Sequence, residues 1–238
     1  MDWLELQFDE NNEPISPIFS DRYFSRSSGR SETEYVFLQH NGLPERWRGS
    51  GTFSIGEIGF GTGLSFFLTL MKWNELRAEM TQGELTFISV EKFPIRPSDI
   101  EAILRRQIQL EVPDSFLNSY AHFQPGWNML VLEDQSVTLE LFIGEALEGL
   151  SSRPFLVDAW FYDGFAPGRN PDLWHDELYG ALAQHSLKGT SLATFTAAGR
   201  VRRGLQAVGF DMQKAKGFGR KRDMLFGVFQ PQVENEDA

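Results

Sequence analysis

The chain has 238 residues, 41% of them hydrophobic and 23% charged, a globular composition that excludes wholesale disorder. Taken over the whole chain, the formal net charge of −11 argues against a nucleic-acid partner. The absence of cysteine excludes disulfides, thiolate zinc sites and thiol nucleophiles, and it fits a reducing compartment.

Residues 1–51 show no clear alternation of strand and helix patterns. They contain Pro14, Pro17, Pro44 and several glycines and serines, so we expect an N-terminal extension or cap that folds over the core. The first residues are acidic and lack the basic region and apolar run of a secretory signal. We therefore predict a cytoplasmic protein.

Residues 52–230 alternate strand and helix patterns. Runs rich in β-branched and aromatic residues predict strands at 52–58, 85–90, 137–143, 155–162, 191–196 and 224–229. Helix patterns lie between them at 64–76, 97–109 and 176–186. This alternation predicts the α/β class, with a Rossmann-like, mostly parallel sheet that has helices on both faces.

Three further segments complete this outline. The polar residues 133–136 separate two apolar runs, which predicts a hairpin that interrupts the alternation. Residues 231–238 are polar and acidic, and we expect a frayed tail. The most apolar stretch, 64–73, is far shorter than the roughly 20 residues of a membrane helix, so we predict no membrane segment.

The first predicted strand leads into the sequence GFGTG and then into an apolar helix. Such a loop lets the backbone approach a ligand beside a helix N-terminus. A nicotinamide-binding loop needs glycine where this chain has Leu64, whereas the pattern Glu57-x-Gly59-x-Gly61-x-Gly63 suits methyltransferases that bind S-adenosylmethionine. The alternative is a structural turn without a ligand.

Two acids follow the next two strands. Glu91 ends the second predicted strand, where a carboxylate can accept both ribose hydroxyls of a nucleoside that lies across the strand ends. Glu145 follows the third and is a candidate acceptor for the adenine amine. An exposed strand-end acid and a solvated loop acid are the respective alternatives.

The turn DGFAP follows the apolar strand at 155–162 and delivers Asp163 to the carboxyl edge of the sheet. Substrates of open α/β sheets usually lie at this edge. An acid, backbone carbonyls and the aromatic ring of Phe165 together resemble the turn with which amine methyltransferases orient an NH group and stack the ring that bears it. A capped turn without catalytic function is the alternative, since Asp, Gly and Pro are common turn residues.

Basic residues are concentrated in one segment of this acidic chain. Residues 199–222 contain eight basic residues and one acid, a local charge of +7, so the rest of the chain carries −18. We predict an RNA-binding surface there, with a solvated face or ion-paired arginines as the alternatives. Its candidate residues are Arg200, Arg202, Arg203, Arg220, Lys221 and Arg222. The four histidines show no metal-ligand spacing, and we predict no metal site.

A series of sequence motifs along nearly the whole chain resembles those of one family. The motifs are SPIFSDRYFS, EYVFLQHNGLPERW, GEIGFGTGLSFF, FISVEKFP, DAWFYDGFAPGRNPDLW, LATFTAAGRVRRGLQAVGF and KGFGRKRDML. The chain is similar to the methyltransferase half of the bifunctional tRNA 5-methylaminomethyl-2-thiouridine biosynthesis enzymes (MnmC) and to their stand-alone relatives. This resemblance implies that tRNA is the partner and S-adenosylmethionine the cofactor, which methylates the aminomethyl group of a wobble uridine. It also implies a separate flavin-dependent oxidase, or another enzyme, that supplies the amine.

The chain departs from the family pattern at a few positions. Ser65 stands where the family usually has asparagine, Glu145 stands where it has aspartate, and Gly-Arg-Ser-Glu at 29–32 replaces Gly-Leu-Glu-Glu. Asp163 and Phe165 match the pattern. Free aspartate is a poor base for an alkyl amine, by roughly six pKa units, so we expect Asp163 to orient the amine. A methyltransferase for a small-molecule amine and a non-catalytic nucleotide-binding module are the competing functions.

Overall fold

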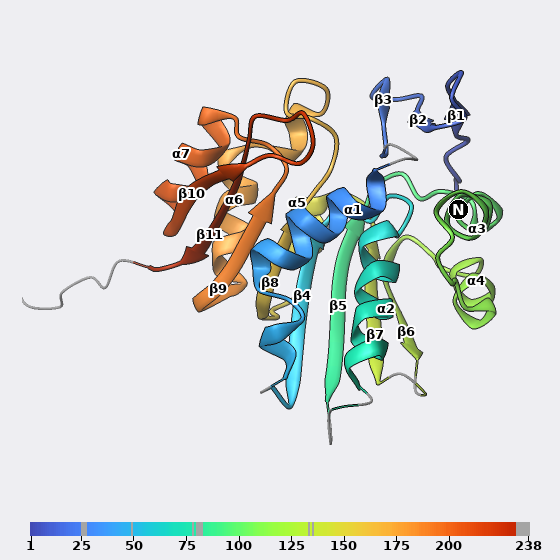
Figure 1. Cartoon of the computed structure of the whole chain (residues 1–238), viewed down its shortest axis with the longest axis horizontal. Helices are drawn as coiled ribbons and strands as arrows, with labels where there is room; N and C mark the ends of the chain where they lie inside the picture. Colours follow the sequence, from blue (N-terminus) through green and yellow to red (C-terminus); the bar gives the residue numbers. More distant parts are fainter. Residues whose placement is uncertain are drawn as a thin grey trace, which may run out of the picture.

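A mixed sheet of eight strands organises the chain, in the spatial order β10-β11-β9-β8-β4-β5-β7-β6 (Figure 1). This computed structural model describes residues 1–24, 28–48, 50–77, 79, 83–132, 134 and 136–231. The strands are β4 (Thr52–Ile58), β5 (Glu84–Glu91), β6 (Gly126–Leu132), β7 (Val137–Ile143), β8 (Val157–Tyr162), β9 (Ser186–Thr194), β10 (Phe210–Lys216) and β11 (Asp223–Phe229).

Neighbouring strands from β9 to β7 are parallel, whereas β11 and β6 are antiparallel to their neighbours. The predicted α/β class with a mostly parallel sheet is therefore confirmed. From β4 the chain first adds β5 and β7 on one side and later adds β8 and β9 on the other. This reversal of strand order opens a crevice at the carboxyl ends of the central strands, where open α/β sheets bind ligands.

Helical segments cover both faces of the sheet (Figure 1). One face packs against α1 (Gly29–Thr33), η1 (Glu34–Leu38), α2 (Leu64–Arg77), α3 (Pro97–Glu101), η4 (Ala102–Ile108) and α4 (Asp114–Tyr120). The other packs against α5 (Ala146–Ser151), α6 (Asp176–Gln184) and α7 (Gly199–Ala207). The short turns are η2 (Gln39–Asn41), η3 (Glu45–Trp47) and η6 (Pro171–Leu173).

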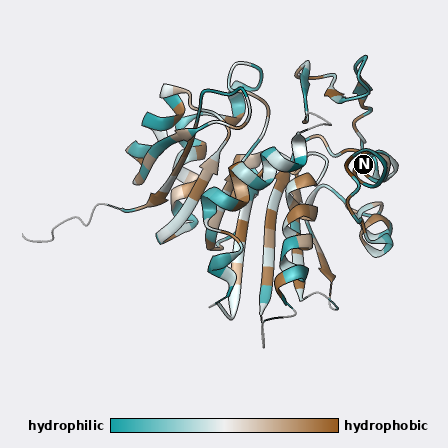
Figure 2. Ribbon diagram, viewed as in Figure 1, coloured by the Kyte–Doolittle hydropathy of each residue, from teal (hydrophilic) through white to brown (hydrophobic). Residues whose placement is uncertain are grey.

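The two faces bury separate hydrophobic clusters because side chains alternate along each strand. On β8, Phe161 belongs to the cluster of the first face, and Trp160 belongs to that of the second. The central strands are largely brown and white in Figure 2, whereas teal is frequent on outer helices such as α7. The first two turns of helix α2, residues 64–70, are buried on all sides because the helix lies between the sheet and the N-terminal helices.

The N-terminal segment contains a small antiparallel sheet of β1 (Gln7–Phe8), β2 (Pro14–Ser16) and β3 (Asp21–Arg22). It is not only a cover, because Val36, Phe37 and Trp47 are almost completely buried in the core cluster of the first face. The proposed division into 1–51, 52–230 and 231–238 stays a prediction, and residues 232–238 of the tail lie outside the described residues.

Most predicted elements form, with shifted ends. Strand β9 begins five residues earlier than predicted and ends at Thr194, and the predicted helix at 97–109 divides into α3 and η4. The predicted hairpin is the antiparallel pair β6 and β7, although Glu133 and Gln135 of its turn lie outside the described residues. Strand β10 and helix α4 were missed, since the charged sequence FDMQKAK lacks a β-branched run and α4 is short. Among the described residues, no helix combines the length and apolarity needed to cross a membrane.

Candidate active site at the carboxyl edge of the sheet

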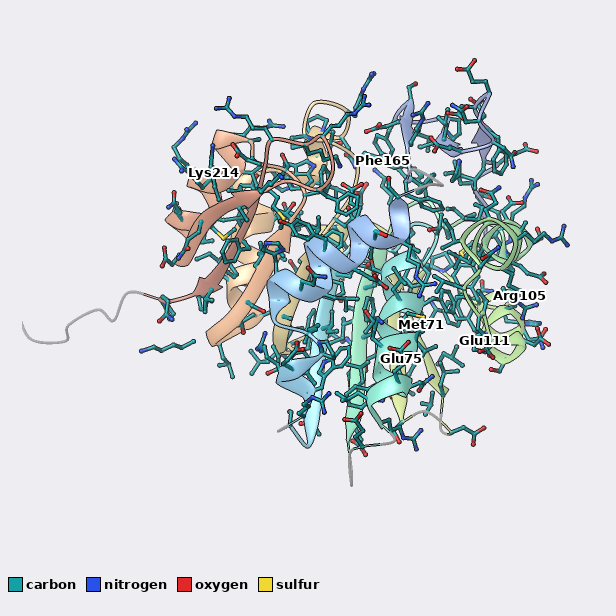
Figure 3. The ribbon with its side chains drawn as sticks, viewed as in Figure 1. Met71, Glu75, Arg105, Glu111, Phe165 and Lys214 are labelled. Atoms are coloured by element: carbon teal, nitrogen blue, oxygen red, sulfur yellow. The ribbon has the colours of Figure 1, made fainter. Side chains whose placement is uncertain are left out.

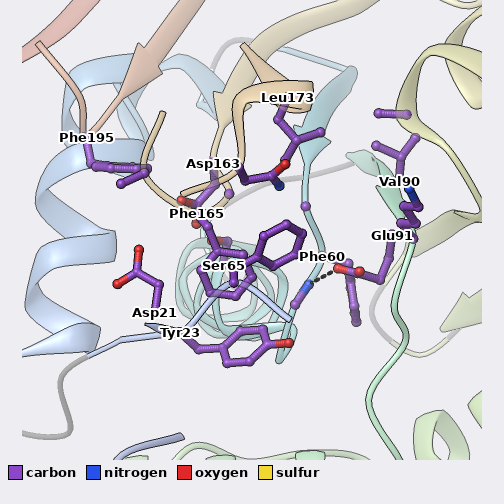
Figure 4. A pocket seen from close by; sticks show the side chains of 18 of the residues that line it. Asp21, Tyr23, Phe60, Ser65, Val90, Glu91, Asp163, Phe165, Leu173 and Phe195 are labelled. Carbon is purple, nitrogen blue, oxygen red and sulfur yellow. Dashed lines mark hydrogen bonds between the residues drawn. The ribbon is translucent and has the colours of Figure 1, made fainter. Parts of the chain in front are cut away.

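A cavity of about 680 Å³ lies at the carboxyl ends of the central strands (Figure 4). Its volume is in the range of sites that bind small molecules and cofactors. Seven predicted site residues line it: Gly59, Gly61, Glu91, Glu145, Asp163, Phe165 and Lys221. Glu57, Gly63 and the other five basic candidates are not among the lining residues.

The glycine loop between β4 and α2 forms the floor of the cavity. The amides of Gly59 and Phe60 both donate to the carbonyl oxygen of Val90, which ties the loop to the end of β5. Gly59 has φ +87°, and a Cβ there would lie 3.4 Å from Cα of Gly164. Glycine therefore satisfies both the left-handed backbone and the close approach of the turn that carries Asp163.

Glu91 connects this loop to the end of β5. Its two carboxylate oxygens accept hydrogen bonds of 2.7 Å from the amides of Gly61 and Phe93. Figure 4 draws one hydrogen bond to Glu91 as a dashed line. Burial raises the pKa of Glu91, and these backbone hydrogen bonds oppose the rise. The side chain is held in a fixed orientation at the cavity, with lone pairs left over to accept from a ligand.

Glu57 lies in β4, opposite Ser89 of β5 in the parallel register. It is 2% exposed and accepts a 2.7 Å hydrogen bond from the Ser89 hydroxyl. Burial raises its pKa well above the usual value; the hydrogen bonds with Ser89 and Ser65 oppose this rise, and the charges of Asp163 and Glu91 add to it. Glu57 does not line the cavity, and its partners Ser89 and Ser65 lie in β5 and α2, next to the glycine loop. This position fits a residue that supports the loop from beneath.

Glu145 stands at the N-terminus of α5 and lines the cavity. Its side chain is 58% exposed and forms an ion pair with Lys92. The structure therefore places this acid at the rim of the cavity, beside the ends of β5 and β7. Its role stays a prediction.

Asp163 follows β8 directly and lies where the turn approaches the glycine loop. Burial raises the pKa of its carboxyl to about 7; the Gly164 amide and the charge of Lys221 lower it, and the charge of Glu32 raises it. The gap to an alkyl amine is therefore about three pKa units, smaller than the six expected from free aspartate. The gap is smaller than expected because the turn lies inside a cavity, where burial raises the pKa of Asp163, and not on an open edge.

Phe165 lies above the carboxyl edge of the sheet (Figure 3), and Figure 4 shows it close to Tyr23. Its ring centroid is 4.8 Å from that of Phe19 and 5.0 Å from that of Tyr23. The indole NH of Trp174 donates a 2.9 Å hydrogen bond to the Phe165 carbonyl oxygen. Phe165 is thus held both through its ring and through its carbonyl oxygen, and the cluster of the three rings offers aromatic surfaces to a planar ligand.

The N-terminal segment supplies one wall of the cavity, which sequence reasoning missed. Phe19 and Tyr23, beside β3, line it, as does Glu32 of α1. In the sequence, the only indication of this wall was the family motif SPIFSDRYFS, which does not tell where the segment lies in space. Contacts with Phe165 decide where this segment lies.

The basic candidates lie on two elements near the same edge. Helix α7 carries Arg200, whose guanidinium donates to the Pro167 carbonyl oxygen, and the exposed Arg203. Arg202 is half-buried, with its Nε enclosed. The β10–β11 loop carries Arg220, Lys221 and Arg222, all exposed.

Metal-binding geometry is not found among the described residues, which contain no group of three or more His, Asp or Glu side chains able to hold an ion. His185 is buried against Phe155, and its ring nitrogens face the carbonyl oxygens of Phe155 and Leu150. His175 lines the cavity, a position that its sequence context did not predict.

The strand order and the antiparallel strand β11 define the Rossmann-like fold of class I methyltransferases, with the cavity at the carboxyl edge of the sheet. Residues 110–230 match the family described as S-adenosyl-L-methionine-dependent methyltransferase, and the chain belongs to this family. S-adenosylmethionine is accordingly its methyl donor. A solved structure, MNMC2 from Aquifex aeolicus, supports the fold with a TM-score of 0.69, at 21% identity over 94% of this chain and 69% of that chain.

Two curated relatives are similar over almost the whole chain. Both are named tRNA 5-methylaminomethyl-2-thiouridine biosynthesis bifunctional protein MnmC. The protein from Ectopseudomonas mendocina is 44% identical over 98% of this chain, and that from Chromobacterium violaceum is 47% identical over 92%. The aligned part is 36% and 33% of their respective lengths, so the chain spans about a third of these relatives.

Proposed function

We propose that this protein methylates the aminomethyl nitrogen of 5-aminomethyl-(2-thio)uridine at the wobble position of tRNA. The observation that carries the proposal is the 44–47% identity, over more than nine tenths of the chain, to proteins named for the biosynthesis of the methylaminomethyl nucleoside. The cavity supports it chemically, because it combines an acid on a turn with an aromatic cluster.

The cavity offers hydrogen-bond donors and acceptors that match S-adenosylmethionine. In this proposal the amides of the glycine loop, from Gly59 to Gly63, approach the cofactor, and Glu91 accepts its ribose hydroxyls. Glu145 takes the adenine side, and Glu57 supports the loop from beneath. When bound, the cofactor supplies an electrophilic methyl group on a sulfonium.

Asp163 and Phe165 take the acceptor side in this proposal. The Asp163 carboxylate and nearby backbone carbonyls accept hydrogen bonds from the amine and aim its lone pair. Phe165, with Phe19 and Tyr23, packs on the uracil ring and excludes water from the reacting atoms. No side chain of this protein has to form a covalent bond.

We further propose that tRNA lies across α7 and the β10–β11 loop, beside the cavity mouth. A separate flavin-dependent oxidase or comparable enzyme supplies the aminomethyl group, and a tRNA substrate places the activity in the cytoplasm. A methyltransferase for a small-molecule amine is the main alternative, and the basic segment disfavours it. A non-catalytic nucleotide-binding module is disfavoured by the buried acid and the aromatic cluster at the cavity.

The test of function is nucleoside mass spectrometry of tRNA that carries 5-aminomethyl-2-thiouridine, after incubation with labelled S-adenosylmethionine. We expect one labelled methyl group on the side-chain nitrogen of the wobble nucleoside. Labelling of free amines but not of tRNA would instead identify a small-molecule methyltransferase. Binding of the cofactor without transfer to either acceptor would identify a binding module.

Removal of the Glu91 carboxylate is expected to weaken binding of S-adenosylhomocysteine, the demethylated cofactor. Glu91→Ala removes the proposed ribose acceptor, at a cost of about 1.5 to 3 kcal/mol, or about 10- to 150-fold in affinity. Calorimetry measures the affinity, and Glu145→Ala at the rim is the matched control, with a smaller expected loss. Parental affinity of the Glu91 variant would remove Glu91 from the cofactor site.

The pH dependence of kcat/KM is expected to show two groups. Asp163, with a pKa of about 7, must be ionised, and the substrate ammonium, with a pKa of about 10, must lose its proton. Log kcat/KM should therefore rise with a slope of about two below pH 7 and about one above it. In Asp163→Asn the break near pH 7 should disappear. A parental slope of one below pH 7 would mean that Asp163 takes up the proton of the amine, against its orienting role.

A further inference from the structure

Lys221 occupies a position different from that of the neighbouring arginines. Its Nζ lies 2.5 Å from Oε1 of Glu32 in α1 and 5.0 Å from the centroid of the Phe195 ring, just after β9. Glu32 is only 22% exposed, and Lys221, Glu32 and Phe195 all line the cavity. The Lys221 side chain is 50% exposed and lies along the cavity wall, where it pairs with Glu32 and contacts the Phe195 ring.

The backbone of the β10–β11 loop maintains this arrangement. The amide of Gly217 donates to the carbonyl oxygen of Arg222, and the amide of Lys221 donates to that of Phe218. The Tyr35 hydroxyl donates a 2.9 Å hydrogen bond to the carbonyl oxygen of Lys216, which anchors the loop to the N-terminal helices. Two independent contacts therefore connect this loop with the helical segment that carries Glu32.

Lys221 is a cation in a largely acidic cavity. Glu57 lies beneath Asp163, and the charged and titratable groups that line the cavity with it are Asp21, Arg22, Tyr23, Glu32, Glu91 at the end of β5, Lys92, Glu145, Asp172, His175 and Lys221. The other two cations pair with acids away from Asp163, Arg22 with Asp9 and Glu13 and Lys92 with Glu145. The charge of Lys221 favours the ionised form of Asp163, and the charge of Glu32 disfavours it. Asp163, Phe165 and Lys221 line the same cavity, so an amine held at Asp163 would share it with this ammonium.

We propose that Lys221, held by Glu32, is a positioning residue of the methyl-transfer site, where its ammonium faces the Asp163 carboxylate and the acceptor amine. This inference rests on the proposed amine methyltransferase function and gives Lys221 a role other than phosphate binding. A fixed cation beside the amine disfavours a second positive charge, so the substrate loses its ammonium proton more readily. The same cation keeps Asp163 ionised and ready to accept an NH bond.

The reaction explains why this charge matters. The amine's lone pair forms the new N–C bond while the C–S bond breaks with its electron pair on sulfur, and the methylated nitrogen then loses a proton to water. A protonated amine has no lone pair and cannot react. Lys221 thereby enlarges the reactive fraction of bound substrate at neutral pH without touching the methyl group.

The test compares pH profiles of Lys221→Gln and Glu32→Gln with the parent. In Lys221→Gln, two features of the pH profiles should move to higher pH by about one pH unit. One is the break in log kcat/KM at the pKa of Asp163. The other is the rise of the single-turnover rate at the pKa of the bound amine. In Glu32→Gln, the Asp163 break should move to lower pH. Lys221→Arg should restore the parental profile. Damage to the fold cannot move the same break in opposite directions.

A matched control removes the same charge elsewhere in the basic segment. Lys214 of β10 pairs with Asp223, does not line the cavity and lies apart from Phe165 in Figure 3, so Lys214→Gln should keep the parental profile. The slope of tRNA affinity against salt should be parental in Lys221→Gln. If Lys221→Gln flattens the salt slope and keeps the parental pH profile, Lys221 contacts a phosphate and the inference is wrong. Parental pH profiles in both Lys221→Gln and Glu32→Gln would also overturn the inference. Failure of the parent to methylate tRNA would instead overturn the proposed function.

Discussion

Asp163→Ala is expected to slow single-turnover methyl transfer by about 10²- to 10⁴-fold, the range for loss of a group that positions or exchanges protons with a reacting atom. The reason is geometric, because Asp163 lies on a rigid turn at the cavity, and its proposed partner is the amine and not the cofactor. Affinity for S-adenosylhomocysteine should change by about twofold or less. Quench-flow with saturating cofactor and RNA measures the chemical step.

Two variants make this result specific. Asp163→Asn keeps the shape of the side chain and one acceptor oxygen, so its rate should lie between the parent and the alanine variant. Asp172→Asn removes a negative charge from the exposed rim of the same cavity and should retain most of the rate. If Asp163→Ala methylates at the parental rate, or if Asp172→Asn is equally slow, the assignment of the DGFAP turn is wrong.

Affinity for tRNA is expected to fall about 10³-fold or more between 50 and 200 mM salt if about six phosphates are contacted. Arg203, Arg220 and Arg222 are exposed, and the ion pairs of the described residues do not involve them. Replacing all three by glutamine should flatten the slope of log affinity against log salt by about 2 to 2.7. Binding of S-adenosylhomocysteine should barely respond.

The control removes three cations from the opposite edge of the sheet. Arg48 precedes β4, Arg77 ends α2, and Lys188 lies near the start of β9. The variant with glutamine at these positions has the same net charge as the first, and its salt slope should match the parent. Equal flattening in both variants would mean diffuse electrostatic attraction, and parental slopes in both would place the RNA on another surface.

Several features could be predicted from local sequence because local forces determine them. Strand β4, the glycine loop and the start of α2 appear as a buried apolar run, glycines and an apolar helix, and the structure has them at the predicted residues. Strand β10 could not be predicted in this way. Its charged residues face outward, and its backbone forms a strand because β11 pairs with it over seven residues.

The candidate site shows the same division. Glu91 and Asp163 could be found because the first ends an apolar strand, the second directly follows one, and parallel strands bring their carboxyl ends to one edge. Phe19, Tyr23 and Glu32 could not, because the segment that carries them has no periodic pattern and reaches the cavity through contacts distant in sequence. Lys221 could not be distinguished from its arginine neighbours either, because its ion pair with Glu32 joins segments that are distant in sequence.

The sequence by itself determined the α/β class, the glycine loop, the strand-end acids and the family, since these depend on residue type and order along the chain. Only the tertiary structure decided that Glu57 lies beneath the loop, that Lys221 belongs to the cavity, and that burial raises the pKa of Asp163 to about 7. Desolvation and ion pairing depend on which groups surround a side chain, and folding brings those groups together from distant segments.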